Sequence, residues 1–255
     1  MFNIFRRKEN RQNNKTEKLT YELEIAKQKL ISDLEENGME FLVTKMGCDD
    51  EYSELILERR KIDLSYCSED SVAWYAYKQS DKLHSDKDKT ELLELLTTEK
   101  YSNYKKYIYC CLASICSNTN DKDLFNFLID KVQQEDDESI KISILSRLQK
   151  IKKDSDYNIE PIKILIRDGT EGETRAAIRA LSNTNDPEVE DIFLNEFKIS
   201  DRHMKGTICG PLSTVGTLKS IPILKDAHKK TRDGGLRMLI ENAISEIENR
   251  LTSSH

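Results

Sequence analysis

Apolar residues recur every three or four positions along most of this chain, which is the spacing at which side chains share one face of an α-helix. The clearest early stripe begins after Thr16, ends at Asn37-Gly38 and consists of Leu19, Leu23, Ala26, Leu30 and Leu34. This stripe predicts one long amphipathic helix. Less regular patterns predict helices over about 39–47, 50–62 and 70–83, and the polar run Ser85-Asp86-Lys87-Asp88 is read as the separator that follows them.

A longer period marks the second half of the chain. The pentapeptide Ser117–Asp121 recurs letter for letter as Ser182–Asp186, 65 residues later. A spacing of about half that distance separates successive apolar residues that each precede a loop. We call these residues the landmark residues. They lie 31 to 33 positions apart and are Cys116, Leu148, Leu181, Leu212 and Ile244. The pattern therefore predicts a repeated unit of about 32 residues.

Each repeat reads as a helical hairpin. The first helices are expected over 104–117, 138–151, 172–183, 202–215 and 234–251, each ending near a landmark residue. Four second helices follow, with the apolar sets Leu124, Phe125, Leu128; Ile162, Leu165, Ile166; Val189, Ile192, Phe193; and Leu218, Ile221, Leu224. Asp186 before Pro187, and Asp121 in the earlier copy, have the chemistry of helix N-caps. Such hairpins bury their apolar faces only by stacking, which predicts a solenoid.

One repeat resembles a known family. Residues Thr174-Arg175-Ala176-Ala177-Ile178-Arg179-Ala180-Leu181 run into an Asn-containing turn and Asp186-Pro187. This pattern is similar to HEAT-like repeats of the short bacterial kind, and the resemblance covers about 104–251. The predicted fold is all-α: a right-handed α-solenoid of HEAT-like hairpins after an irregular N-terminal helical region. Gly206, Gly210 and Pro211 depart from the pattern and predict a kinked or loosely packed repeat.

Composition agrees with an all-α chain and suggests three regions. Nine Gly and four Pro in 255 residues are few for a fold with many tight turns. The first eighteen residues carry six basic and two acidic side chains, although the whole chain has a net charge of -6. We expect a flexible basic arm over 1–15, a helical region over 16–100 and the solenoid over 101–255. A membrane-surface or nucleic-acid contact of the arm stays open.

The sequence offers no catalytic or metal-binding motif. Its six cysteines include no C-x-x-C pair, so we interpret them as buried packing residues in a reducing cytoplasm. The vicinal pair Cys110-Cys111 is the one candidate for another role. No phosphate-binding loop, nucleophile elbow or zinc motif is present. No apolar run approaches the roughly 20 residues that span a bilayer. We predict no catalytic residue, metal or cofactor, and a cytoplasmic location without a membrane span.

A cation recurs once per repeat near the start of the first helix. These residues are Lys141, Arg175, Lys205 and Arg237. Equivalent positions of stacked repeats align along one side, so the four cations form a predicted ladder. In the family that the chain resembles, this cation often pairs with an acid of the adjacent repeat. The ladder therefore either stabilises the stack or receives an acidic partner.

Aromatic residues concentrate in one segment. Seven of the ten tyrosines and the single tryptophan lie between positions 66 and 109. Tyr and Trp combine a large, rigid apolar surface with a polar tip and are enriched at interface centres. Trp74, Tyr77, Tyr101 and Tyr104 are accordingly predicted to bind a partner, and core packing is the alternative.

These features favour a non-catalytic protein-binding or scaffold module that holds a partner on a solenoid surface, for example a toxin-blocking or an adaptor protein. The resemblance leaves two alternatives open: a nucleic-acid-binding, DNA-glycosylase-like enzyme and a phycobilin-lyase-like protein. The net charge of -6 and the single Trp argue against a nucleic-acid groove, and no residue specifies a pigment site. Another protein is the expected partner, and the sequence does not predict the oligomeric state.

Overall fold

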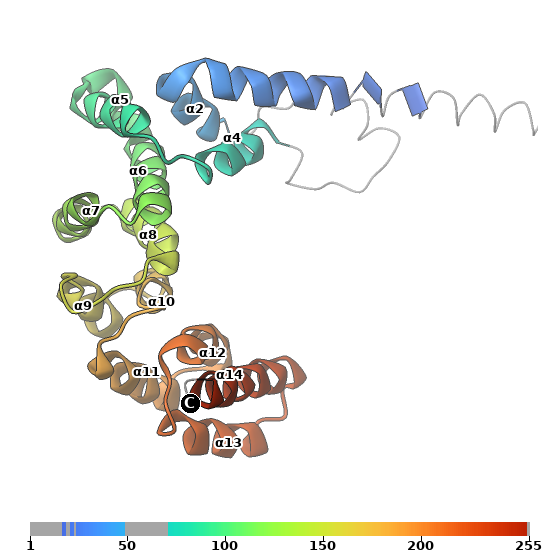
Figure 1. The fold of residues 1–255 in the computed structure, drawn as a ribbon, viewed down its shortest axis with the longest axis vertical. Coiled ribbons are helices and arrows are strands. Elements are labelled where there is room, and N and C mark those ends of the chain that lie inside the picture. The colour runs from blue at the N-terminus through green and yellow to red at the C-terminus, as the bar shows by residue number, and fades with distance from the viewer. Residues whose placement is uncertain (1–16, 19–20, 23, 49–70, 254–255) are drawn as a thin grey trace, which may run out of the picture. The chain divides into compact units, whose positions relative to one another are not determined.

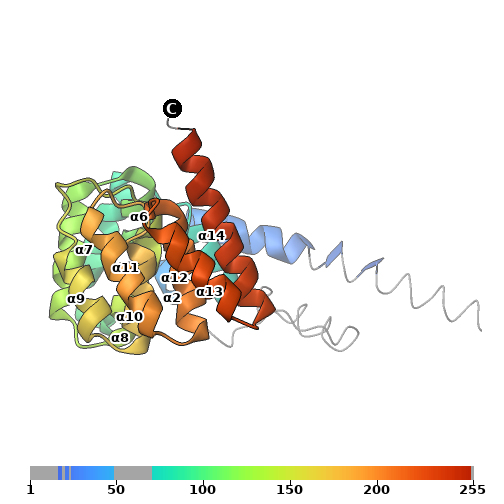
Figure 2. The same cartoon turned by 90° about the horizontal axis from the view of Figure 1, so that it is seen from below.

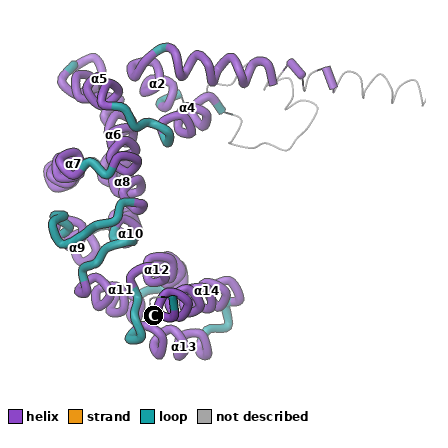
Figure 3. Tube along the Cα trace, in the orientation of Figure 1, coloured by secondary structure: helices purple, strands orange, loops and turns teal. Residues whose placement is uncertain are grey.

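The computed structural model describes residues 17–18, 21–22, 24–48 and 71–253, and this part of the chain is all-α (Figures 1 and 3). The predicted arm over 1–15 and the predicted helix over 50–62 lie outside it. Among the described helices, none combines the length and the apolar character that crossing a membrane requires. The all-α prediction is confirmed.

The chain divides into two compact units, Met1–Cys111 and Leu112–His255. The boundary falls inside one helix, α6 (Lys105–Thr119). Each unit has its own core and is described by itself.

In the first unit, residues 24–36 are helical and the helix stops where Asn37-Gly38 predicted. Gly38 has a φ of 75°, a left-handed conformation that glycine adopts without steric cost. The following elements are α2 (Gly38–Met46), α4 (Val72–Ser80), α5 (Asp86–Thr97), the 3₁₀ helix η2 (Glu99–Tyr104) and the start of α6. Helix α2 packs against α4 and α5 and contributes the buried Leu42, Val43 and Met46.

Helix α5 corrects the reading of Ser85–Asp88 as a separator. Ser85 is the N-cap of α5, because its side chain accepts the backbone N–H of Asp88 at 3.1 Å. Asp86 and Asp88 lie in the first turn, where negative charge is favoured by the helix dipole. The polar run therefore begins a helix, and the apolar Leu92 further along that helix is fully buried.

The second unit consists of helical hairpins. Its elements after α6 are α7 (Lys122–Gln134), α8 (Glu138–Arg147), the 3₁₀ helix η3 (Leu148–Lys150), α9 (Glu160–Asp168), α10 (Glu171–Ala180), α11 (Pro187–Ile199), α12 (Arg202–Val215), α13 (Ser220–Lys230) and α14 (Gly234–Thr252). Helices α8, α10, α12 and α14 pack in succession, and α7 with α9 and α11 with α13 pack on the other side (Figures 1 and 2). The unit thus has two layers of helices.

Most predicted core positions of the second unit are buried, Leu165 and Ile192 are half-buried, and two predictions are corrected. Cys116, Leu148, Leu181 and Leu212 are fully buried. The fifth landmark residue, Ile244, lies within α14 instead of before a loop and is only half-buried, because Ala243 and Ile247 face the core. Leu218 precedes α13 and has 72% of its surface exposed, so its place in the predicted apolar set is wrong.

Helix α12 corrects the predicted interruption at Gly206, Gly210 and Pro211. The helix runs without a break through Pro211 and packs against α10, α11 and α14. Gly206 lies where α14 approaches, since a Cβ atom there would be 3.1 Å from the side chain of Leu239. Gly206 therefore accompanies a close helix contact, and α12 has no break at this position.

The two copies of the pentapeptide have different backbones. In the first, α6 continues to Thr119 and Asn120 is the left-handed residue, with a φ of 54°. In the second, α10 ends at Ala180 and Asn183, two places earlier in the motif, has a φ of 59°. Both copies still end in an N-cap, as predicted: Asp121 accepts the N–H of Leu124 and Asp186 that of Glu188.

Candidate partner-binding surfaces

Two of the predicted aromatic residues, Tyr77 of α4 and Tyr104 of η2, contact the ring of Tyr107 in α6. Trp74 lies one turn before Tyr77 on α4, and its ring contacts Tyr75 edge to face. The rings of Tyr77 and Tyr107 are edge to face with centroids 6.2 Å apart, and those of Tyr104 and Tyr107 are 6.4 Å apart. Both Tyr104 and Tyr107 pack over Gly47, where a Cβ atom would lie 3.0 and 3.1 Å from their rings. We call Trp74, Tyr77, Tyr104 and Tyr107 the aromatic cluster.

These four side chains are half-buried, which separates them from Tyr101. Tyr101 has only 5% of its surface exposed, and its hydroxyl accepts a hydrogen bond from Lys100 at 2.8 Å. Of the four predicted interface aromatics, Tyr101 is therefore a core residue of the first unit. Trp74, Tyr77 and Tyr104 keep exposed ring surface.

Two lysines border the aromatic cluster. The ammonium of Lys78 lies 5.4 Å from the ring centroid of Trp74, and that of Lys106 lies 5.7 Å from the ring of Tyr107. A cation over a ring face is attracted by the ring quadrupole, by about 0.5–1 kcal/mol at exposed sites. The cluster thus presents aromatic surface beside positive charge.

The first two members of the cation ladder are paired within the protein. Lys141 of α8 lies 2.8 Å from Glu173 of α10, and 18% and 7% of their side chains are exposed. Arg175 lies 2.6 Å from Glu171, four residues earlier on the same helix. Lys141 therefore connects adjacent hairpins, and Arg175 pairs locally.

The other two members have no acidic partner among the described residues. Lys205 of α12 places its ammonium 5.8 Å from the ring centroid of Phe197, and Arg237 of α14 is exposed. The structure thus does not give the four cations one common role.

Lys205 also lines a cavity of about 440 Å³ in the second unit, formed where α11 and α13 end and α12 and α14 begin. Its apolar surface comes from Phe197, Ile223, Ala227 and Leu236. Its charged residues are Lys198, Arg202, Lys205, Lys230 and Asp226. We call this cavity the basic pocket. Sequence reasoning found only Lys205, because the remaining residues come from four helices and share no motif.

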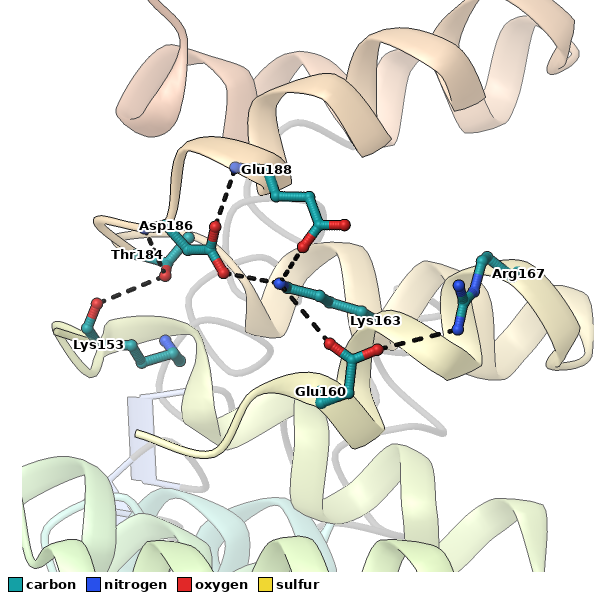
Figure 4. Close-up of polar contacts among 7 residues, drawn as sticks. All are labelled: Lys153, Glu160, Lys163, Arg167, Thr184, Asp186 and Glu188. Atoms are coloured by element: carbon teal, nitrogen blue, oxygen red, sulfur yellow. Dashed lines mark hydrogen bonds and ion pairs between the residues drawn. The ribbon is translucent and has the colours of Figure 1, made fainter. Parts of the chain in front are cut away.

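Lys163 of α9 forms the densest polar contact in Figure 4. Its amino group lies 2.7 Å from Asp186, 2.6 Å from Glu188 and 3.7 Å from Glu160. Only 8% of its side chain is exposed. Burial disfavours the charge of Lys163, but the hydrogen bonds to Asp186 and Glu188 outweigh burial and raise its pKa. This contact joins α9 to the start of α11 and surrounds the ammonium of Lys163 with carboxylates of the protein.

Lys153 is fully buried and lies in the loop after η3. Its amino group donates to the carbonyl oxygens of Ile151 and Ser182, at 2.6 and 3.1 Å, and forms no ion pair with a carboxylate of the described residues. Its backbone forms a β-bridge with Thr184, and Thr184 Oγ1 donates to the Lys153 carbonyl (Figure 4). Burial lowers the pKa of Lys153 to about 7.

The buried thiols also have perturbed pKa values. Burial raises the pKa of Cys110, Cys116 and Cys209 to about 12, so these thiols are poor nucleophiles near neutral pH. The vicinal Cys111 is also buried. No group of metal-ligating side chains occurs in the described part of the chain. Thr170 caps α10 in a capping box with Glu173, so the segment Gly169–Gly172 connects α9 to the first turn of α10.

Comparisons of the chain with models of protein families, with curated proteins and with solved structures found no match.

Proposed function

We propose that this chain is a non-catalytic protein-binding module whose second unit is an α-solenoid of HEAT-like hairpins. The 32-residue period and the successive packing of α8, α10, α12 and α14 support the solenoid. The free cysteines of the described residues support a reducing compartment such as the cytoplasm. A scaffold or adaptor that holds another protein is the function that fits these features best.

The aromatic cluster is the observation that carries this proposal. Half-buried Trp and Tyr side chains hold their rings in place by contacts within the protein and leave ring surface for a partner. Ordering such a surface on binding costs little side-chain entropy, which is why a few aromatic residues supply much of the binding energy of many interfaces. Lys78 and Lys106 add positive charge and favour an acidic partner surface.

Catalysis is the weaker reading of the same structure. The most perturbed amine, Lys153, is enclosed and bonded to two carbonyl oxygens, so a substrate has no access to it. The raised thiol pKa values act against nucleophilic chemistry at the cysteines. The net charge of -6 also disfavours a long nucleic-acid footprint.

Alanine substitution with two readouts tests the proposal. The full chain and its Trp74→Ala, Tyr77→Ala and Tyr104→Ala variants would each be used to capture partners from the native cell, with thermal unfolding measured in parallel. We expect capture of the same protein to fall about tenfold or more while most of the stability is kept. Tyr157→Ala is the matched control, because Tyr157 is half-buried but belongs to the second unit. Unchanged capture by all three variants would reject the aromatic cluster as the interface.

A further inference from the structure

The basic pocket combines an apolar lining with an excess of positive charge. Phe197 and Leu236 are buried, whereas Ile223 and Ala227 are half-buried and form the accessible part of the apolar lining. A cavity of about 440 Å³ falls in the range of about 300–1,000 Å³ that is usual for ligand sites. The cavity therefore has room for apolar side chains of a bound segment.

The charges of the basic pocket are only partly neutralised. Lys230 lies 2.7 Å from Asp226, and Arg202 lies 3.2 Å from Asp233. Lys198 and Lys205 form no ion pair within the part of the chain that the structure describes. Two helices end and two begin around the cavity, so their dipoles oppose one another and the side chains decide the sign of the potential.

Lys205 contributes to both properties of the basic pocket. Lys205 lines the pocket, and its ammonium lies over the ring of Phe197, 5.8 Å from the centroid, which places the charge beside apolar surface. A charge in such a place is less well hydrated than one in open water, which strengthens its attraction for an anion. A ligand that offers carboxylates around an apolar side chain matches this arrangement.

We propose that the basic pocket binds an acidic segment of a partner protein, with an apolar side chain against Ile223 and Ala227 and carboxylates at Lys198 and Lys205. This inference rests on the proposed function only in that the partner is a protein, since the site lies in the second unit and uses no residue of the aromatic cluster. Charge complementarity selects the occupant: an acidic segment supplies the two missing counter-charges, and its apolar residue fills the lining.

Three labelled peptides test the inference with the full chain. In the first, Leu and Phe alternate with Glu; in the second, Ser replaces both apolar residues; in the third, Lys replaces Glu. By fluorescence anisotropy we expect the first peptide to bind at least about tenfold more tightly than the other two, and its binding to weaken as salt rises.

Two kinds of variant locate the binding site. Lys198→Glu combined with Lys205→Glu should weaken the first peptide at least about tenfold, and Lys150→Glu with Lys229→Glu is the matched control. The control residues are exposed, unpaired among the described residues and outside the cavity. Ala227→Leu fills the cavity without changing charge and should also weaken binding, and thermal unfolding would verify that each variant is folded.

Several outcomes would overturn the inference. If the charge-reversal variant and its control lose the same affinity for the first peptide, then binding depends only on the net charge of the chain. Equal binding of the Ser-containing peptide would remove the role of the apolar lining. Tighter binding of a single-stranded oligonucleotide or of inorganic phosphate, or competition by a second copy of the chain, would assign the pocket to another occupant. Trp74→Ala should leave peptide binding unchanged, which separates failure of this site from failure of the aromatic cluster.

Discussion

The amino group of Lys163 lies 2.7 Å from one carboxylate oxygen of Asp186, while the other oxygen of Asp186 accepts the backbone N–H of Glu188 at 2.9 Å. One carboxylate therefore caps α11 and joins that helix to α9 of the preceding hairpin. The sequence motif Asp186-Pro187 predicts only the cap. The ion pair with Lys163 is visible only in the structure.

Substitutions of Asp186 separate its two tasks. Asp186→Ala loses both the cap and the ion pair. We expect it to lower the free energy of unfolding by at least about 1–2 kcal/mol, the usual cost of losing a cap. Asp186→Asn keeps a capping side chain, leaves Lys163 with Glu188 and Glu160, and should cost less. Urea unfolding of the three proteins measures the difference. Equal costs for Asn and Ala would mean that the ion pair, and not the cap, dominates.

The same residue predicts a dependence on acid. Burial raises the pKa of Asp186, but the hydrogen bonds from Lys163 and Glu188 outweigh it, and the net pKa is lowered from 3.8. A carboxyl with a lowered native pKa contributes stability above its unfolded pKa, and this contribution is lost as pH falls through the native value. The stability difference between the parent chain and Asp186→Asn should therefore shrink below about pH 4. A constant difference down to pH 2 would contradict this.

Lys141 and Arg175 should differ in their effects on stability. Lys141→Met leaves the carboxylate of Glu173 buried without its cation, and we expect a loss of about 2 kcal/mol or more. Arg175→Met removes an i to i+4 pair at the surface and should change stability by no more than about 0.5 kcal/mol. The Nε atom of Arg175 is buried without a hydrogen-bond partner, which further limits the loss. Thermal unfolding of both variants checks the contrast, and equal losses would reject it.

The buried amine of Lys153 should make stability rise with pH just above neutrality. Its native pKa is about 7 and its ordinary value is 10.5, so between these values the unfolded chain binds the extra proton. The rise should reach at most about 1.4 kcal/mol per pH unit. The buried cysteines act in the opposite direction above pH 9, because their native pKa values are raised. Urea unfolding between pH 7 and about 8.5 therefore isolates the lysine, and Lys153→Met should flatten the slope.

Gly206→Ala tests the reading of α12 as a continuous helix. Alanine is favoured over glycine inside a helix by about 0.5–1 kcal/mol. The added Cβ would lie 3.1 Å from the end of the Leu239 side chain, which is 39% exposed and free to move aside. We expect a gain in the free energy of unfolding. A decrease in the free energy of unfolding of more than about 1 kcal/mol would show that the side chain of Leu239 cannot move aside at the α12–α14 contact.

The sequence predicted the hairpins of the second unit because burial of one helix face is a local, periodic property. The same reasoning missed α5, since Ser85–Asp88 is equally typical of a polar linker and of a capped first turn. It also placed Leu218 in the core, because hydrophobic character alone does not tell whether a residue precedes a helix or lies within it.

The candidate sites were less predictable than the fold. Lys153 follows another lysine and reads as a solvated position, yet its burial depends on the loop of the next hairpin. The basic pocket depends on which helix ends meet, and only Lys205 carried a periodic signal. Tyr101 and Tyr104 look equivalent by spacing, but only Tyr101 is buried. Spacing along the chain identifies candidate side chains, and packing assigns their exposure.

The two copies of the pentapeptide have a consequence for protein engineering. A consensus hairpin averaged over these repeats would inherit both asparagines at the loop, although the first copy needs its left-handed residue at the position of Asn120 and the second at that of Asn183. Such an averaged loop could close in either of two ways, and its helices would differ in length accordingly. A designer who wants a uniform array from this chain has to choose one loop geometry, and the β-bridge between Lys153 and Thr184 belongs to the second.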